Sequence, residues 1–323
     1  MRCFFNILKV SFIYVGTVIG AGFASGKEIR LFFSECGIFA PVLSGILSGV
    51  FATVFLLIGR HGKGKFLHTT FFNVLICIAS IISFAAMCAG SDAVYNGYGI
   101  KFGGIVTTGI ILILLSFGVE KTAVFNTFLQ PIIIFLIFVI FIMNTNCDFS
   151  GGFGFTNAVL YSSMNTLIAG CVMEEEGKKM SDREIYAVGI LSALCMILLT
   201  TFVYCIVKNI ESEMPVIAAA ESCGIGFAAR LIVAFAIFST QTFSAYVIYN
   251  RFNDIIGEKF TYLLLFVLSL IGTVLGFETI VVYGYPLTSV IGFIAVVTTV
   301  AVFAKNVKEI FSSDKLRKNR LNK

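Results

Sequence analysis

Charged residues are scarce in this sequence: Asp, Glu, Lys and Arg make up only 13% of the 323 residues. Apolar residues make up 58%, and the mean hydropathy is +0.97, far above the values of soluble globular domains. This composition excludes a soluble protein and indicates an integral membrane protein. The formal net charge is +5, but the basic residues lie in short loops between apolar runs, so no nucleic-acid partner is expected.

Motifs for several kinds of chemistry are missing. The sequence has no HExxH, GxSxG or P-loop motif, so neither an enzyme nor an ATP-driven machine is expected. Its two histidines, His61 and His68, lie seven residues apart without further ligands, which argues against a metal site. The nine cysteines contain no CxxC pair and lie mostly inside apolar runs, as small buried residues do. No cofactor is therefore expected.

Long apolar runs recur along the whole chain. Each has 17 to 26 residues, which matches the ~20 residues that a helix needs to cross the hydrocarbon core of a bilayer. Because the runs are continuous rather than alternating, a membrane β-barrel is excluded. The sequence predicts an all-α polytopic membrane protein that forms a single domain over residues 1–323. Its ten predicted spans are 5–26, 37–59, 69–91, 102–118, 122–143, 152–173, 185–207, 226–250, 260–277 and 279–304.

The basic residues predict the orientation. If the N-terminus lies inside, all but five of the 23 Lys and Arg residues fall on the inner side, as the positive-inside rule requires. We therefore expect a multi-pass protein of the cell membrane with both termini in the cytoplasm, a first run retained as a helix rather than cleaved as a signal peptide, and a basic cytoplasmic tail at 305–323. Cys36 and Cys147 would share the outer face, so a disulfide between them stays open.

Two halves of five spans, about 1–148 and 149–304, would have opposite orientations, which is the geometry of an inverted repeat. Glycine and polar interruptions concentrate in the first span of each half. In the first half they lie in VGTVIGAGFASGKEI, residues 15–29, and in the second half in YSSMNT, residues 161–166. Such a pair of interrupted apolar segments indicates the binding site of a transporter.

Four glycines in the first segment allow two interpretations. Gly16 with Gly20, and Gly22 with Gly26, have the spacing of close helix packing in lipid. Alternatively, the helix breaks around Gly20 to Gly22 and its freed backbone groups bind a ligand, with the half-helix that starts near Phe23 pointing its positive end at a carboxylate. The glycine spacing alone does not decide between these two interpretations. The matching interruption in the second half favours the broken helix.

Polar side chains in other spans also have alternative interpretations. The cluster from Tyr161 to Asn165 could bond a neighbouring helix, but its density favours a polar cavity. The hydroxyls of FSTQTFS, residues 238–244, either bond the carbonyls of their own helix or form an oxygen cage for sodium, and the sequence does not decide. Lys27 and Glu28 are candidates for a function because charge is costly in a membrane, but snorkelling or pairing with each other explains them equally well. A relay of several buried carboxylates is not visible.

The stretch GTVIGAGFASGKEI, followed by Phe32 and Phe33, together with Tyr161-x-x-x-Asn165, resembles the YkvI-type bacterial membrane proteins, which are classed as amino-acid permeases. More distantly the chain is similar to the amino acid-polyamine-organocation superfamily with the leucine-transporter fold. One departure is Lys27, where that family often has a neutral glutamine.

The resemblance implies a five-plus-five inverted repeat with broken first and sixth helices, and a substrate held between the two breaks. The matching substrate-binding residues are Gly20, Ala21, Gly22, Phe23, Tyr161, Ser162 and Asn165. A coupling sodium ion would be held by first-helix carbonyls and eighth-helix hydroxyls, which here are those of Gly16, Ile19, Ser239 and Thr240.

The expected function is therefore secondary active transport of an amino acid or a similar small zwitterion, by alternating access. Because an ATP-binding motif is missing, the energy would come from a sodium or proton gradient. The alternative is a membrane ligand sensor that uses a transporter-like fold without transporting. A channel is less favoured because no charged ring or filter-like repeat is visible. The expected partners are a small-molecule substrate and the lipid bilayer, and no protein partner is predicted.

Overall fold

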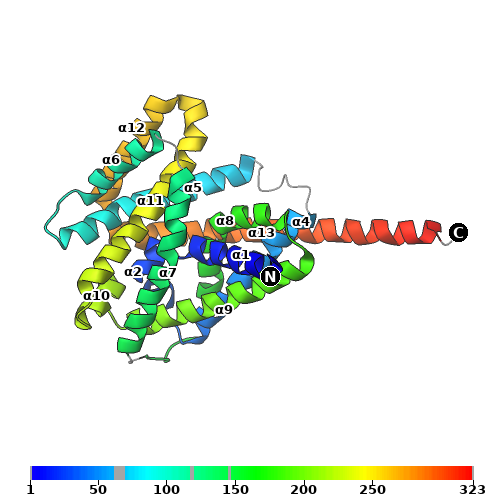
Figure 1. Cartoon of the computed structure of the whole chain (residues 1–323), viewed down its shortest axis with the longest axis horizontal. Coiled ribbons are helices and arrows are strands. Elements are labelled where there is room, and N and C mark those ends of the chain that lie inside the picture. The colour runs from blue at the N-terminus through cyan, green and yellow to red at the C-terminus, as the bar shows by residue number, and fades with distance from the viewer. Residues whose placement is uncertain (1, 62–69, 117–119, 145–146, 322–323) are drawn as a thin grey trace.

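The computed structural model describes residues 2–61, 70–116, 120–144 and 147–321, and these residues form helices without a β-strand. Every one of the ten predicted apolar runs contains a helix, which confirms the all-α prediction (Figure 1). The helices are α1 (Arg2–Val18), α2 (Ala21–Ser25), α3 (Lys27–Phe33), α4 (Phe39–His61), α5 (Thr70–Asn96), α6 (Gly103–Ser116), α7 (Glu120–Met143), α8 (Phe155–Gly177), α9 (Asp182–Val207), α10 (Pro215–Ser222), α11 (Gly226–Ile256), α12 (Glu258–Leu275) and α13 (Phe277–Leu321).

Six of these helices are long and apolar enough to cross a membrane, namely α4, α5, α9, α11, α12 and the first part of α13. Shorter apolar helices lie within α1, α6 and α7. The protein is thus a multi-span membrane protein. The ten-span inverted repeat stays a prediction, since α8 is not among the six candidate spans found within the described residues.

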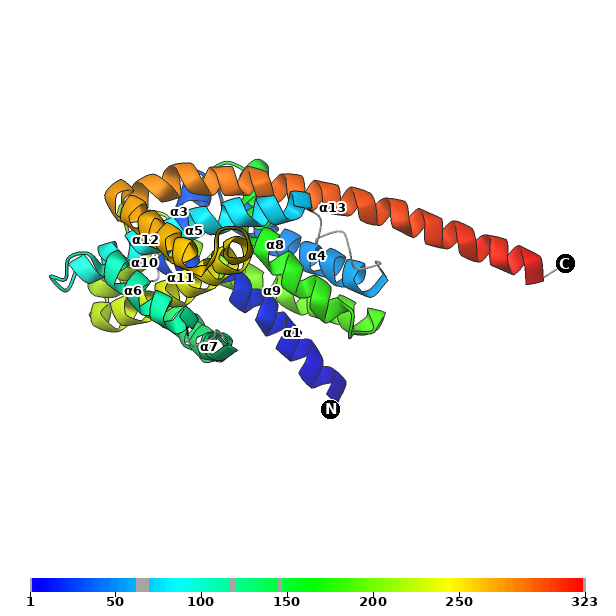
Figure 2. The ribbon, with the colours of Figure 1, turned by 90° about the horizontal axis from the view of Figure 1, so that it is seen from above.

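The loops sort into two opposite ends of the molecule. At one end, Arg60 and His61 at the end of α4 contact Asp182 at the start of α9, at 2.5 Å and 2.9 Å. At the other end, Lys208 after α9 lies 3.4 Å from the Asp148 carboxylate before α8. The N-terminal end of α1 leaves the bundle at the bottom of the view in Figure 2, and the long C-terminal part of α13 leaves it at the right. The orientation of the protein in the membrane stays a prediction from the basic residues.

The core forms around α4, which packs along α8 and α9, while α5 packs along α11, α12 and α13. Small residues permit the closest approach: a Cβ at Gly45 would collide with the backbone of Ile197, and one at Gly49 with the backbone of Gly189 and with Ala193. Close packing of this kind replaces the hydrophobic effect as the main attraction between helices in lipid. These contacts pack α4 closely against α8 and α9, next to the first span.

The first span is interrupted twice. It separates into α1, α2 and α3, with Gly20 in an extended conformation (φ −86°, ψ −172°) between the first two. The sequence predicted a break around Gly20 to Gly22, and the structure has a break at Gly20. The second interruption, at Gly26, was not predicted. Gly26 has φ +79°, and a Cβ there would collide with Val207 and Val216. Glycine is therefore required at this turn for two independent reasons.

The sixth span is not broken, so this part of the prediction is wrong. α8 runs without interruption from Phe155 to Gly177. Within it, Ser162 donates to the Ala158 carbonyl at 2.6 Å, Thr166 donates to the Ser162 carbonyl at 2.6 Å, and Asn165 donates to the Tyr161 carbonyl at 3.2 Å. Each of these three side chains bonds a carbonyl four residues earlier. Polar residues that satisfy themselves in this way do not need the helix to open.

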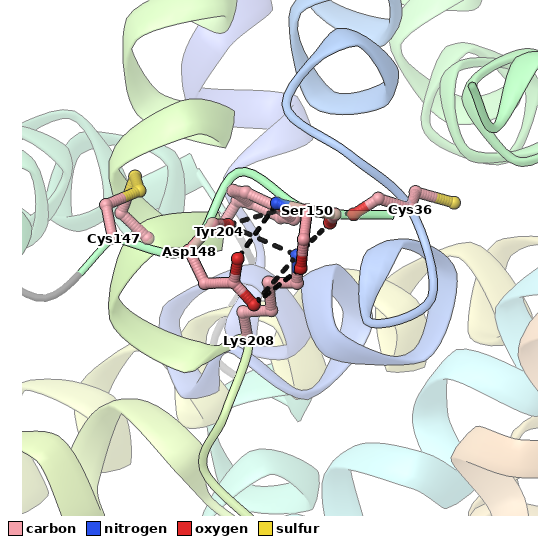
Figure 3. The surroundings of a disulfide bond; sticks show 7 residues. Cys36, Cys147, Asp148, Ser150, Tyr204 and Lys208 are labelled. Atoms are coloured by element: carbon pink, nitrogen blue, oxygen red, sulfur yellow. Dashed lines mark hydrogen bonds and ion pairs between the residues drawn. A yellow bond between two sulfur atoms is a disulfide. The ribbon is translucent and has the colours of Figure 1, made fainter. Parts of the chain in front are cut away.

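A disulfide joins Cys147, before α8, to Cys205 at the end of α9. Cys36 keeps a free thiol, which lies 3.7 Å from the Phe32 carbonyl of its own segment. The open alternative of a Cys36–Cys147 bond is thus wrong. Cys36 still lies in the same region, because its carbonyl accepts a hydrogen bond of 2.8 Å from the Tyr204 hydroxyl (Figure 3).

Lys208 reinforces this crosslink. Its ammonium group donates to the carbonyls of Asp148 and Ser150 and faces the Asp148 carboxylate (Figure 3). Hydrogen bonds from the backbone and side chain of Ser150 lower the pKa of the Asp148 carboxyl, and Lys208 lowers it further. Asp148 therefore stays ionised, and the segment that leads into α8 is fixed to the end of α9.

Candidate functional site

The break of the first span lies against the middle of α11. The Ala21 N–H donates to Oγ1 of Thr240 at 3.2 Å, and the Thr240 hydroxyl donates to the Ala236 carbonyl at 3.0 Å. A Cβ at Gly20 would lie 3.5 Å from the same Oγ1, an ordinary contact. The structure thus brings together a substrate-site residue predicted in the first span and a sodium-site residue predicted in the eighth.

The remaining predicted sodium ligands are Gly16, Ile19 and Ser239. Ile19 and Ser239 are buried, and each of the three residues takes part in other interactions within the protein. Thr240 already uses its hydroxyl as donor and acceptor. Among the described residues, His, Cys, Asp and Glu form no group of three or more that could hold a metal ion. The sodium site stays a prediction.

Glu28 lies at the centre of the interrupted segment. Its side chain turns back from the first turn of α3 onto α2, so that a Cβ at Gly22 would collide with the Glu28 carboxylate. The residue is only 7% exposed, and its Oε2 has no hydrogen-bond partner. Tyr285 of α13 lies close to the carboxyl group. Gly22 therefore makes room for a buried acid, which helix spacing did not indicate.

Tyr161 of α8 reaches the same place. Its ring packs edge-on against Phe32 and Phe33 of α3, with ring centroids 5.6 Å and 5.2 Å apart. The Tyr161 hydroxyl is fully buried and lies close enough to Glu28 to interact electrostatically. Asn165 lies near it, but the hydroxyl makes no hydrogen bond of acceptable geometry. The two interrupted segments predicted from the sequence thus meet at this tyrosine and Glu28.

The other predicted substrate-binding residues are placed differently. Ser162 donates to the Ser44 carbonyl of α4 at 3.0 Å as well as to its own helix, so it belongs to the α4–α8 contact. Asn165 is half-buried, and its amide bonds the Tyr161 carbonyl. Ala21 and Phe23 are buried in α2. Of the second-half residues, Tyr161 is the one whose buried polar atom lacks a partner and lies beside the break.

The half-helix after the break is shorter than the sequence suggested. α2 has five residues and ends at the left-handed Gly26 before α3 begins. A macrodipole grows with the number of aligned peptide units, so α2 contributes little beyond the polarity of its individual backbone groups. The expected attraction for a carboxylate therefore depends on single N–H groups rather than on a helix dipole.

Lys27 does not pair with Glu28. Its ammonium group lies 2.9 Å from Oε1 of Glu278 at the start of α13 and 3.3 Å from the Ser212 carbonyl. Lys27 has a nearly buried side chain, 10% exposed, whereas the Glu278 side chain is 67% exposed. Two neighbours in sequence thus point to different partners, and the ion pair ties α3 to the first turn of α13.

We expect the two halves of this ion pair to respond unequally to mutation. Glu278→Gln leaves a buried ammonium group without its counter-ion and should lower the free energy of unfolding by about 1–3 kcal/mol. Lys27→Met leaves an exposed carboxylate that water solvates, and should cost less. Thermal unfolding of the purified variants measures both effects. An equal loss, or a larger one for Lys27→Met, would contradict the buried position of Lys27.

A hollow of about 520 Å³ opens elsewhere, on the surface of α12 and the end of α11. It is lined entirely by apolar side chains, Ile256, Phe260, Leu263, Leu264 and Val267. A site for a polar solute needs convergent polar groups, so this hollow fits the acyl chain of a lipid better than a substrate. The polar candidate site remains the break of the first span.

Comparisons with known proteins find distant relatives of the chain. No family model matches it. It is 25% identical over 217 residues to the uncharacterized membrane protein YkvI of Bacillus subtilis (strain 168), a match that covers 57% of this chain and 60% of YkvI. It is 24% identical over 311 residues to the uncharacterized protein YyaD of the same strain, covering 87% of this chain and 92% of YyaD.

The fold and these matches define an all-helical, multi-span membrane protein that is homologous to uncharacterized bacterial membrane proteins. The match to YkvI spans less than two thirds of that protein's length. Neither printed description states a substrate or an activity. Function must therefore be argued from the site.

Proposed function

We propose that the protein is a secondary active transporter for an amino acid or a related small zwitterion. One observation carries this proposal: the first span is interrupted at Gly20, and the side chain of Glu28, which lies against Gly22, has a buried carboxylate oxygen without a hydrogen-bond partner. Interrupted backbone at membrane depth is stable only where protein or a polar cavity surrounds it. Transporters use such interruptions as binding sites.

The chemistry of the groups at the break suits a zwitterion. The backbone N–H groups of Gly22 and Phe23, in the first turn of α2, are donors for a carboxylate, and the Glu28 carboxylate is an acceptor for an ammonium group. The Tyr161 hydroxyl can donate or accept. Asn165 and the more distant Ser162 would complete the wall on the side of α8. An enzymatic reaction is not proposed, because these groups supply binding without an activated nucleophile.

The topology of the proposal places both termini in the cytoplasm of a cell-membrane protein. It is supported by the excess of Lys and Arg at the end that carries the termini. It is also supported by the Cys147–Cys205 disulfide at the opposite end, since disulfides persist on the oxidising side of a membrane. The five-plus-five inverted repeat belongs to this proposal, with its second half beginning before an unbroken α8.

Alternating access would move the segments that close the outer end. α3 is held there by Lys27 to Glu278 and by Arg30, which donates to the Ile210 carbonyl and lies 3.3 Å from Glu211. These contacts join α3 to α13 and to the loop after α9. Substrate entry from that side requires them to separate, whereas the α4 contacts with α8 and α9 can stay fixed.

Uptake into proteoliposomes tests the proposal. The purified full chain is reconstituted and given a panel of labelled amino acids, with sodium gradients and pH gradients imposed separately. A transporter accumulates at least one amino acid above its external concentration under one gradient, and protein-free liposomes do not. Binding without accumulation would support the alternative of a ligand sensor. Neither binding nor accumulation across the panel would overturn the proposal.

A further inference from the structure

Glu28 is a buried carboxyl group without a cation. The two basic residues of its own helix are engaged elsewhere: Lys27 with Glu278 and Ser212, and Arg30 with Ile210 and Glu211. Glu28 itself is 7% exposed. A buried carboxylate that is neither paired nor hydrogen-bonded on both oxygens is costly, so it is normally neutralised. The Glu28 site must therefore take up a positive charge from outside the protein.

The groups that face Glu28 are neutral. Gly22 of α2 lies against its carboxylate, and Tyr285 of α13 and the Tyr161 hydroxyl of α8 lie nearby. α4, α9 and α10 also pack against α3, but in the described part of the chain they bring no charged group to Glu28. The phenols of Tyr161 and Tyr285 stay protonated at physiological pH. They can hydrogen-bond a carboxyl group but cannot neutralise it.

Two buried oxygen atoms without hydrogen-bond partners indicate where a positive charge could bind. Oε2 of Glu28 and the hydroxyl of Tyr161 are both buried and lack hydrogen-bond partners. The first belongs to Glu28, whose side chain lies against Gly22 just after the break, and the second belongs to Tyr161 of the unbroken α8. A proton on Oε2 would neutralise Glu28, and so would the ammonium group of a bound amine, which could also donate to Tyr161. One carboxylate requires only one of these charges.

We propose that Glu28 is a shared site for which a proton and the ammonium group of the substrate compete, so that the protein exchanges protons for an amine-bearing solute. This inference rests on the proposed function and makes it more specific. When the ammonium group binds, the proton leaves the Glu28 carboxyl for the solvent on the open side. When a proton returns from the other side, the amine is released there. Proton and substrate therefore cross in opposite directions.

Chemical labelling tests the shared site without requiring transport. Dicyclohexylcarbodiimide reacts with protonated carboxyl groups in apolar surroundings, and mass spectrometry locates the modified residue in the full chain. We expect labelling of Glu28, falling about tenfold for each pH unit above the midpoint of its titration. Glu35, an exposed acid just after α3, is the control within the same molecule and should not be labelled. Labelling of Glu28 should be lost in Glu28→Gln and kept in Glu35→Gln.

Competition is tested with methylammonium, the smallest primary-ammonium probe. Methylammonium chloride should slow the labelling of Glu28, whereas sodium chloride at the same concentration should not. Equal protection by both salts would overturn the proposal in favour of a site for metal cations. Failure of Glu28 to react at any pH, or labelling that neither pH nor methylammonium changes, would also overturn it. None of these results depends on amino-acid uptake, so failure of the transport proposal is seen separately.

The direction of the pH gradient gives a second test. An exchanger accumulates substrate in proteoliposomes that are acidic inside, because protons leave as the substrate enters. A symporter instead needs an acidic exterior. The labelled amino-acid panel should therefore accumulate only with the acidic interior, and Glu28→Gln should lose this response while Glu35→Gln keeps it. Accumulation driven by an acidic exterior would overturn the exchange.

Discussion

Gly22→Ala is expected to reduce gradient-driven uptake at least tenfold, whereas Gly20→Ala should retain most of it. At Gly22 the added methyl group would collide with Cγ, Cδ and Oε1 of Glu28. The Glu28 side chain must then move away from the break. At Gly20 the same methyl group would meet Thr240 at 3.5 Å and 3.7 Å, which are ordinary contacts, and the backbone φ of −86° suits alanine. Initial rates of uptake into proteoliposomes measure the difference.

The comparison separates function from folding. Glu28 ends in a flexible chain, so the protein can accommodate alanine at Gly22 by displacing the carboxylate while the helices stay packed. Both variants should therefore purify as the wild type does and elute at the same volume in size-exclusion chromatography. Equal uptake by the two variants would contradict the role of Gly22 in making room for Glu28. Leucine at either glycine is a harsher change, and we expect it to abolish uptake at both positions.

Loss of the Cys147–Cys205 disulfide is expected to lower the free energy of unfolding by about 4 kcal/mol. The bond closes a loop between residues 58 apart and therefore restricts the unfolded chain strongly. It also joins the entrance of α8 to the end of α9. Cys147→Ser should unfold at a clearly lower temperature than the wild type, and adding a reducing agent to the wild type should have the same effect.

The matched control is Cys195→Ser, which changes a half-buried free thiol of α9. It should shift the unfolding temperature much less, and its response to the reducing agent should equal that of the wild type. Lys208 still donates to Asp148 and Ser150 after reduction, so the loop should keep its place until the protein unfolds. If Cys147→Ser and Cys195→Ser unfold at the same temperature, the disulfide does not stabilise the protein as proposed.

Local patterns predicted the helices and the break at Gly20. A continuous apolar run has few ways to satisfy its backbone in lipid other than a helix, and clustered glycines weaken a helix regardless of its neighbours. The polar cluster from Tyr161 to Thr166 misled the prediction for α8. Serine and threonine can bond either a ligand or a carbonyl of their own helix, and the sequence does not show which bond forms.

The role of Glu28 was left open for a related reason. The sequence shows a Lys-Glu pair near the end of a span, and pairing between neighbours is a natural interpretation. In the fold, Lys27 reaches Glu278, 251 residues away, which leaves Glu28 without a cation. The cost of a charge in a membrane had already made Glu28 a candidate for a function, but it did not separate this role from pairing with Lys27. Its significance became visible only when the partner of Lys27 was known.

The sequence by itself determined that the protein is helical, crosses the membrane several times, and interrupts its first span at Gly20, because hydropathy, helix propensity and backbone freedom are properties of short segments. Only the tertiary structure decided that α8 stays unbroken, that Cys147 pairs with Cys205, and that Gly22 shelters the carboxylate of Glu28 beside Tyr161. Each of these depends on which of several available partners lies within reach. Contacts between segments far apart in the sequence determine which partner each residue meets, and a short sequence pattern does not identify that partner.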